Sequence, residues 1–253
     1  MFRVVILGHG EMLGNLIAGV QDAKCKIVGV MRYERLKKLD IYTKIKDFIL
    51  PSTEYSYIKS YNVPELKSKS ANSEQFKREI LKLNPDLVIV GTWGEKLKKE
   101  SIQLPKIAMI NVHPSLLPKY RGPNPYLETI RHLEKITGIT FHLMSEEYDA
   151  GAILLQKQIE IKPDDTGKEL KERTVLMARK AVTELLNRLA DDFIIPVEQS
   201  EERATYYPQI TRDDIMLDFN KTSEEISAHI RGFYPWSKTY FSYKSKFFTP
   251  NPY

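Results

Sequence analysis

The sequence contains little cysteine: Cys25 is the single example among 253 residues. One cysteine excludes an internal disulfide and a cysteine-cluster metal site, and it fits a reducing compartment. No stretch approaches the roughly 20 apolar residues of a membrane-spanning helix, and the apolar run at 2–7 is too short for the core of a secretory signal. We therefore expect a cytoplasmic protein without a membrane contact.

Specific signals for nucleic-acid binding are also missing, since the sequence has no arginine-rich tract and no zinc-ligand spacing. The formal net charge of +5 and the pI near 9.0 suit an anionic small molecule as well as a nucleic acid. The 42% hydrophobic and 28% charged content is ordinary for a globular chain. The length allows one large domain with or without a small appendage.

Apolar segments alternate with helical patterns through the first half of the chain. The helical patterns lie at 11–20 and 73–83, and the second of these ends at Asn84-Pro85. Continuous runs of β-branched and apolar residues predict strands that are buried on both faces. These strand candidates are 2–7, 26–31, 86–90 and 107–112. The alternation predicts an α/β fold with a doubly wound, mainly parallel sheet.

Later segments have a different character. Strands at 138–144 and 152–161 are expected to be antiparallel at the sheet edge, and a helix at 167–189 follows them. Segment 40–72 is expected to be irregular. After Pro196 the pattern changes to short aromatic strands, at 205–207, 215–219 and 239–248. We therefore predict a catalytic domain at 1–200 and a small β-rich appendage at 201–253.

A glycine-rich turn, Gly8-His9-Gly10, lies between the first strand and the first helix. Amides at a helix N-terminus can hold a phosphate, as in dinucleotide-binding folds. The spacing up to Gly14 departs from the common NAD pattern, although Arg32 is suited to a 2′-phosphate. Two interpretations stay open: a tight turn that starts a buried helix, or a contact with substrate. An NADP-dependent oxidoreductase is the corresponding alternative function.

Two polar residues end the apolar strand that precedes a proline-rich loop. Asn111 and His113 lie on the same side of that strand because side chains alternate. The carboxyl edge of a parallel sheet is where open α/β folds bind ligands, and the three prolines in 114–123 make the following loop stiff. Asp149 lies in a turn between two strands and, taken alone, is an ordinary turn aspartate.

Together these motifs resemble the folate-dependent formyltransferase family over roughly residues 1–190. The resemblance rests on Asn-Val-His-Pro-Ser-Leu-Leu-Pro at 111–118, Arg121-Gly122, Gly-Ile-Thr at 138–140 and Asp-Ala-Gly at 149–151. The family includes methionyl-tRNA formyltransferase, glycinamide ribonucleotide formyltransferase and the N-formyltransferases of nucleotide-linked amino sugars. Its catalytic trio is an asparagine, a histidine and an aspartate. The resemblance therefore implies Asn111, His113 and Asp149.

The chemistry of formyl transfer fits this trio. A neutral amine attacks the formyl carbon of 10-formyltetrahydrofolate and produces a tetrahedral oxyanion. Asn111 can donate a hydrogen bond to that oxygen, and protonated His113 can add a charged one. Asp149 is expected to raise the pKa of His113 by proximity and to take the proton of the amine. The mechanism requires no metal and no covalent enzyme intermediate.

The resemblance also implies a folate pocket built mainly from the backbone of two loops. The candidate folate-binding residues are Trp93, Gly94, Glu95, Lys96, Leu97, Met144, Glu147 and Tyr148. A purely structural aromatic role for Trp93 stays equally open. A non-catalytic folate-binding module is a further alternative function, which the intact trio disfavours.

The acceptor amine is inferred from two segments, 121–126 and 230–236, which resemble the tRNA and sugar branches. The tRNA enzymes continue into a β-barrel, whereas this sequence ends at Tyr253. We therefore expect transfer to the amine of a nucleotide-linked dideoxy-amino sugar used for surface polysaccharide such as O-antigen. The alternative is a methionyl-tRNA formyltransferase with a reduced C-terminal domain, in which case tRNA is the nucleic-acid partner.

Residues from three segments are candidates for contact with the amino sugar and its nucleotide. They are Gly8, His9, Gly10, Lys119, Tyr120, Arg121, Gly122, Tyr234 and Trp236. The aromatic cluster of Phe233, Tyr234, Trp236 and Tyr240 either stacks a base, forms a small core or contacts a second subunit. Pairing of the C-terminal strands across a two-fold axis predicts a homodimer.

Overall fold

A computed structural model describes residues 1–33 and 53–250. Contacts divide the chain into two compact units, and each is described by itself. The N-terminal unit comprises Met1–His113, Thr140–Leu155 and Val175–Gln199. The C-terminal unit comprises Pro114–Ile139, Gln156–Thr174 and Ser200–Tyr253. These units are each made of separate segments, whereas the boundary expected near residue 200 divides the sequence at one point into a catalytic domain and an appendage. That boundary stays a prediction.

A six-stranded sheet has the strand order β2-β1-β3-β4-β5-β6. The first four strands along the chain are parallel to their neighbours, and β5 is antiparallel to β4. The strands are β1 (Arg3–Gly8), β2 (Lys26–Arg32), β3 (Leu87–Gly91), β4 (Ala108–His113), β5 (Ile136–Leu143) and β6 (Ile153–Glu160). The prediction of a mainly parallel sheet with an antiparallel edge is confirmed.

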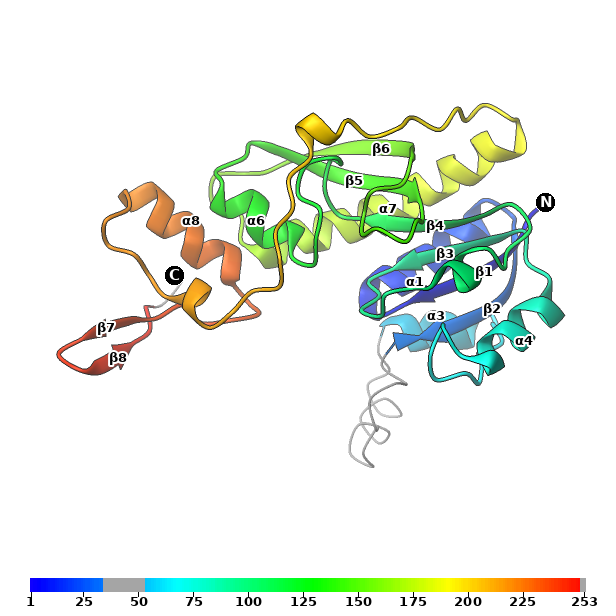
Figure 1. Cartoon of the computed structure of the whole chain (residues 1–253), viewed down its shortest axis with the longest axis horizontal. Helices are drawn as coiled ribbons and strands as arrows, with labels where there is room; N and C mark the ends of the chain where they lie inside the picture. Colours follow the sequence, from blue (N-terminus) through cyan, green and yellow to red (C-terminus); the bar gives the residue numbers. More distant parts are fainter. Residues whose placement is uncertain (34–52, 251–253) are drawn as a thin grey trace. The chain divides into compact units, whose positions relative to one another are not determined.

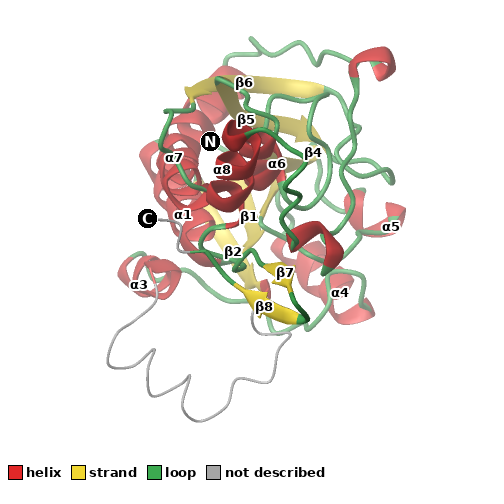
Figure 2. Ribbon diagram, turned by 90° about the vertical axis from the view of Figure 1, so that its left-hand side faces the viewer, coloured by secondary structure: helices red, strands yellow, loops and turns green. Residues whose placement is uncertain are grey.

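Helices cover both faces of the parallel strands, as the continuous apolar runs require. Figure 2 shows α1 (Gly10–Asp22) and α4 (Glu74–Leu83) on opposite sides of them. On one face Val5, Leu7 and Val90 belong to a core that includes Phe76 of α4. On the other face Gly91 lies so close to α1 that an added Cβ would be 2.7 Å from Leu16.

Local capping explains the bounds of two helices. The Ser73 side chain accepts a hydrogen bond from the Phe76 amide, and Asn84 ends α4 in a left-handed conformation, as the sequence predicted. Helix α8 (Ser223–Phe233) begins at a capping box between Thr222 and Glu225. Helix α8 was not predicted, because the aromatic residues in this region favour short strands.

The remaining elements correct two expectations. Residues 53–60 form helix α3 (Thr53–Ser60), although segment 40–72 was expected to be irregular; residues 40–52 lie outside the described residues. Segment 215–219 is not a strand, since a 3₁₀ turn (Asp213–Ile215) leads to a single bridge at Met216. The other elements are α5 (Lys99–Ile102), α6 (Pro125–Arg131), α7 (Gly167–Ala190), a 3₁₀ turn (Glu201–Arg203), β7 (Phe241–Tyr243) and β8 (Lys246–Phe248).

Segment 239–248, expected as one strand, forms two strands, and β7 and β8 pair as a small antiparallel sheet. The small β appendage expected at the C-terminus is confirmed. Segment 205–207 contributes one bridge, between Tyr206 and Arg121, rather than a full strand. No helix within residues 1–33 and 53–250 is long and apolar enough to cross a bilayer.

Candidate active site

The end of β4 is where the sheet changes from parallel to antiparallel pairing. In the β4–β5 register Asn111 lies opposite His142, and His113 lies opposite Thr140. Directly opposed residues project from the same face of a sheet, so their side chains meet. The antiparallel strand therefore brings a second imidazole to the edge that carries Asn111 and His113.

Asp149 reaches this edge from the turn between β5 and β6. Its Oδ1 atom lies 3.3 Å from His113 Nδ1 and 3.2 Å from Asn111 Nδ2. All three residues belong to the N-terminal unit. The structure thus brings together the amide, the imidazole and the carboxylate that the sequence predicted, and their catalytic roles stay a prediction.

Two members of the trio are largely shielded from bulk water, and the third, Asn111, is half-buried. His113 is 4% exposed, and the Asp149 side chain is 11% exposed. Charges interact more strongly in such a site than in water because the local dielectric is lower. An ion pair between His113 and Asp149 can therefore orient the ring with its Nδ1 atom toward the carboxylate.

His142 is a fourth member of the site that the sequence analysis missed. It is 2% exposed, and its Nδ1 atom lies 2.9 Å from the Leu143 carbonyl oxygen. Because a carbonyl only accepts, Nδ1 carries the hydrogen in this bond. In that tautomer Nε2 accepts the hydrogen bond of Asn111 Nδ2, over 3.0 Å. Both amide hydrogens of Asn111 are thus directed, one at His142 and one at Asp149.

The turn that carries Asp149 has an unusual backbone. Asp149 has a φ of 54°, in the left-handed region that residues with a Cβ disfavour. A Cβ added to Gly151 would lie 1.9 Å from the Leu143 carbonyl oxygen, so this position requires glycine. The Gln199 side chain contacts the same turn through hydrogen bonds to the carbonyls of Asp149 and Gly151.

The two loops of the predicted folate pocket both belong to the N-terminal unit and meet at one point. The Lys96 ammonium lies 5.2 Å from the centre of the Tyr148 ring. Trp93 packs edge-on against Tyr33, and a Cβ on Gly94 would meet the Tyr33 hydroxyl at 2.6 Å. The structure therefore brings together the loops at 91–97 and 144–148.

Other members of these loops have structural contacts. The Glu95 carboxylate accepts hydrogen bonds from Ser70, the Ala71 amide and Asn72. Leu97 belongs to the hydrophobic core, and Met144 packs against it. The Glu147 carbonyl accepts from the Ser145 hydroxyl. For Glu95 and Leu97 the observed contacts organise the loop itself.

The glycine-rich turn has the geometry of a tight strand-to-helix connection. A Cβ on Gly8 would lie 2.6 Å from the Gly91 carbonyl oxygen, and Gly10 has a φ of 61°. His9 is the N-cap residue of α1. Both glycines are thus required by the backbone, as the tight-turn interpretation predicts. A contact between this turn and a substrate stays a prediction.

In the C-terminal unit the segment 119–122 is held by the chain around 201–207. The buried Arg121 guanidinium makes a two-pronged ion pair with Glu201, at 2.8 and 3.0 Å. The Tyr120 hydroxyl donates to Glu134, whose carboxylate also lies 3.5 Å from the Lys119 ammonium. Burial and this carboxylate both raise the pKa of Tyr120.

Packing also explains three further candidates in this unit. A Cβ on Gly122 would meet the Tyr207 carbonyl oxygen at 2.1 Å. Trp236 stacks on Tyr126, with ring centres 6.1 Å apart, and Tyr234 is the C-cap residue of α8. These contacts give the tail aromatics a role in local packing, and their role in base stacking stays a prediction.

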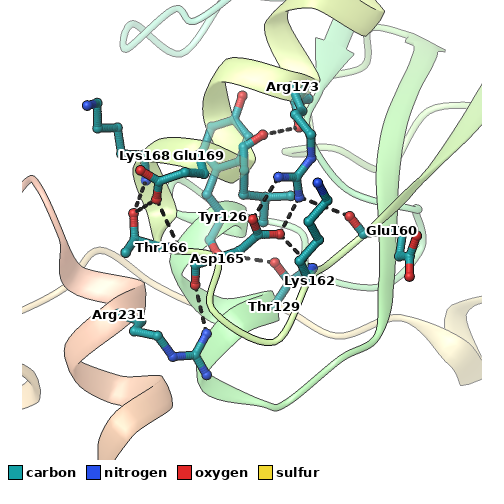
Figure 3. Close-up of polar contacts among 12 residues, drawn as sticks. Tyr126, Thr129, Glu160, Lys162, Asp165, Thr166, Lys168, Glu169, Arg173 and Arg231 are labelled. Atoms are coloured by element: carbon teal, nitrogen blue, oxygen red, sulfur yellow. Dashed lines mark hydrogen bonds and ion pairs between the residues drawn. The ribbon is translucent and has the colours of Figure 1, made fainter. Parts of the chain in front are cut away.

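A polar network fixes the start of α7 in the same unit (Figure 3). The buried Asp165 carboxylate accepts from both Arg173 nitrogens and from the Lys162 amide, and its carbonyl accepts from Arg231 of α8. Burial alone would raise the pKa of Asp165, but these hydrogen bonds outweigh it and the pKa is lowered. The network joins the β6–α7 connection to α8.

No group of three histidine, cysteine, aspartate or glutamate side chains is arranged to hold a metal ion within the described part of the chain.

Comparison with known proteins decides the family. A model described as "Formyl transferase" matches residues 2–186, and one described as "Formyl transferase, C-terminal domain" matches residues 209–249. The chain belongs to the folate-dependent formyltransferase family. It is therefore a formyl-transferring enzyme, which favours the trio's chemistry over the oxidoreductase alternative.

This formyltransferase is similar to proteins of two kinds. It is 34% identical to methionyl-tRNA formyltransferase of Thermotoga maritima, over 91% of this chain and 72% of the relative. For the Enterococcus faecalis enzyme of the same name the identity is 36%, over 96% and 76%. The fold is similar to that of an N-formyltransferase from Helicobacter canadensis, solved with folinic acid and dTDP-3-aminofucose. That likeness has a TM-score of 0.73 and 19% identity, over 97% of this chain and 85% of the other.

Two residues that contact the trio of this formyltransferase were outside the sequence prediction. His142 had a usable signal, because alternation in 138–144 places it on the same face as Thr140. Gln199 had none, since its contact with the Asp149 turn spans 50 positions of the chain.

Proposed function

We propose that this formyltransferase moves the formyl group of 10-formyltetrahydrofolate to the amine of a nucleotide-linked amino sugar, of the dideoxy type used in surface polysaccharides. The reaction rests on one observation: the Asp149 carboxylate lies within 3.3 Å of both Asn111 and His113 in a buried site. The acceptor is supported by a structural likeness that spans 97% of this chain and 85% of the neighbour, and by the nucleotide sugar named for that neighbour.

The proposed reaction begins with attack of the neutral amine on the formyl carbon. The carbon–nitrogen bond forms as the carbonyl electrons move to the oxygen, which becomes an oxyanion. His113 presents Nδ1 to Asp149, so we assign its Nε2 to the oxyanion. Asn111 supplies the second hydrogen bond by turning the hydrogen that otherwise points at Asp149.

Proton transfer completes the reaction. Asp149 takes a proton from the attacking nitrogen, directly or through a water molecule. Once protonated, its carboxyl is a weaker acceptor for the Asn111 hydrogen, which favours the interaction with the oxyanion. Collapse of the intermediate breaks the bond from the formyl carbon to N10, and the proton is delivered to N10. The products are the formamide and tetrahydrofolate.

The folate is proposed to bind between the two loops that meet at Lys96 and Tyr148. Backbone amides and carbonyls of these loops suit the polar edge of a pterin, while Trp93 and Met144 offer apolar walls. The proposal is supported by the contact between the Lys96 ammonium and the Tyr148 ring, which joins the two loops.

A second candidate acceptor is the methionyl group of charged initiator tRNA. It is favoured by identities of 34% and 36% to methionyl-tRNA formyltransferases over more than nine-tenths of this chain. The trio serves either amine equally well, so the acceptor depends on residues outside it.

The test of the proposed function has two arms. Purified protein and 10-formyltetrahydrofolate are incubated with a panel of nucleoside-diphosphate-linked dideoxy-amino sugars or with charged initiator tRNA, and products are identified by mass spectrometry. We expect a formylated sugar. Formylation of tRNA alone would support the second acceptor, and formylation of neither would count against both.

The Asn111→Ala variant tests the mechanism. Loss of one oxyanion donor is expected to lower kcat by about 100-fold to 1000-fold with little change in KM. The measurement is steady-state kinetics with whichever acceptor is active. Asn187→Ala, on the exposed surface of α7 in the N-terminal unit, is the control for asparagine removal and should keep the wild-type kcat. An unchanged kcat in Asn111→Ala would contradict the mechanism.

A further inference from the structure

Gln199 spans the turn that carries Asp149. Its Nε2 atom lies 2.7 Å from the Asp149 carbonyl oxygen and 2.8 Å from the Gly151 carbonyl oxygen. The Nε2 atom of glutamine carries two hydrogens, so this one side chain can donate to both carbonyls. Gln199 therefore links the backbone carbonyls of Asp149 and Gly151, the residues on either side of Ala150.

The segment that supplies Gln199 is itself anchored. Val197 and Ile153 exchange two backbone hydrogen bonds, of 2.8 and 2.9 Å, in an antiparallel bridge beside β6. Gln199 follows this bridge by two residues. Its side chain is therefore delivered to the turn from a fixed point of the N-terminal unit.

The turn requires such support because its backbone is unfavourable. Asp149 has a φ of 54°, a region that aspartate tolerates better than most residues with a Cβ but that still costs more than the common negative range. On the other side the Leu143 amide donates to the Ala152 carbonyl over 2.9 Å, which fixes the end of the turn but not Asp149. The Gln199 contacts act on Asp149 and on Gly151, where the backbone leaves the strand.

The direction of the Asp149 side chain depends on this backbone. Its Oδ1 atom lies near Asn111 and His113 only while the Cα–Cβ bond keeps its present direction. Relaxation of φ to the common negative range would turn that bond away. We propose that Gln199 is a positioning residue, which holds Asp149 in the left-handed conformation and so aims its carboxylate at Asn111 and His113. The inference rests on the proposed formyl transfer.

The main test uses Gln199→Met, which keeps the length of the side chain and removes both donors. Misplacement of a catalytic group by about 1 Å can cost up to roughly 100-fold in rate, so we expect kcat to fall about 10-fold to 100-fold. KM for the folate and the amine should change much less. Gln75→Met, on the exposed face of α4, is the matched control and should keep the wild-type kcat.

Gln199→Glu provides a second variant and a readout specific to the hydrogen bonds. The introduced carboxylate repels both carbonyls at neutral pH, whereas its protonated form can donate one hydrogen. The ratio of its kcat to that of wild type should therefore rise as the pH falls. A merely structural role would not produce this rise. This variant also carries the test if Gln199→Met does not fold.

The outcomes separate this inference from the proposed function. A kcat within twofold of wild type for a folded Gln199→Met protein overturns the positioning role. If no acceptor is formylated by the wild type, the proposed function fails. A crystal structure of Gln199→Met then still tests whether the Gln199 hydrogen bonds hold the Asp149 turn. The expected structure has a negative φ at Asp149 and its carboxylate beyond hydrogen-bonding distance of His113; an unchanged turn overturns the inference.

Discussion

Single residues determine which way the groups of the site point. His142 accepts from Asn111 through Nε2 because its Nδ1 hydrogen is committed to the Leu143 carbonyl. The hydrogen bond to the Leu143 carbonyl therefore fixes the His142 ring, and the ring in turn orients the side-chain amide of Asn111. It lies on the strand opposite Asn111, where it can orient the amide without occupying the space of the reacting atoms.

Replacement of His142 by phenylalanine tests this role. The variant keeps a buried ring but removes the acceptor for Asn111 and the donor for Leu143. We expect kcat to fall about 10-fold, because Asn111 is no longer held. The free energy of unfolding should fall by about 1–3 kcal/mol, since a buried carbonyl loses its partner. Kinetics and urea denaturation give the two values.

His132→Phe is the matched control for the His142 variant. The His132 side chain is 44% exposed and belongs to the C-terminal unit. Its replacement should leave the kcat/KM ratio for folate unchanged. A His142→Phe protein with wild-type kcat would show that the orientation of Asn111 does not depend on the ring.

Elements are joined by polar contacts as well as by packing, and the start of α7 is the clearest case. The Asp165 carboxylate accepts a hydrogen bond from Arg173, and its backbone carbonyl accepts one from Arg231 of α8. All three residues belong to the C-terminal unit. A buried carboxylate of this kind is stable only while its donors remain.

The Arg173→Met variant tests the network. Removal of one partner from a buried ion pair costs about 3–5 kcal/mol, and we expect the lower end because the Arg173 side chain is 30% exposed. The pKa of Asp165 is lowered in the folded protein, so its contribution to stability is present above the ordinary aspartate pKa of 3.8. It is lost as the pH falls through the folded pKa.

Urea denaturation at pH 7 and at pH 3 measures both effects. The wild type should lose part of its stability between the two values, and Arg173→Met should lose less. Lys168→Met, which removes an exposed helical ion pair with Glu172, is the control and should change stability by less than about 0.5 kcal/mol. An equal pH dependence in Arg173→Met and wild type would contradict the assignment to Asp165.

The sequence predicted the elements that carry their own local signals. Strands β1 and β3 are continuous apolar runs, and α4 has a serine cap and an Asn-Pro end. Helix α8 had a capping box that the aromatic residues obscured. In contrast, the Asp149 turn depends on Gln199, a contact between distant segments that leaves no periodic or spacing signal. The trio was predictable only because the family resemblance linked Asp149 to Asn111 and His113.

At the scale of the whole molecule the predicted homodimer concerns the small C-terminal sheet. Its strands β7 and β8 have three residues each, and an isolated two-stranded sheet is marginally stable. Tyr243, Phe247 and Phe248 are exposed on it. Apolar exposure on such a sheet is typical of an interface, so we propose that it pairs with a second copy.

Light scattering coupled to gel filtration tests the dimer. Wild type is expected at twice the mass of the 29.4 kDa chain, and Phe247→Glu should shift it to the monomer by placing charge in the interface. Lys221→Glu, a charge change in the turn before α8, is the control and should stay dimeric. A monomeric wild type at micromolar concentration would contradict the proposal.

The β4–β5 register has a consequence for how such enzymes diversify. Asn111 faces His142, and His113 faces Thr140, through hydrogen bonds of the sheet and not through the length of the chain between them. Insertions or deletions in residues 114–135 therefore leave these pairs intact, whereas a one-residue slip of β5 would place Phe141 where His142 belongs. Lineages that change the length of that intervening stretch can therefore keep both opposed pairs.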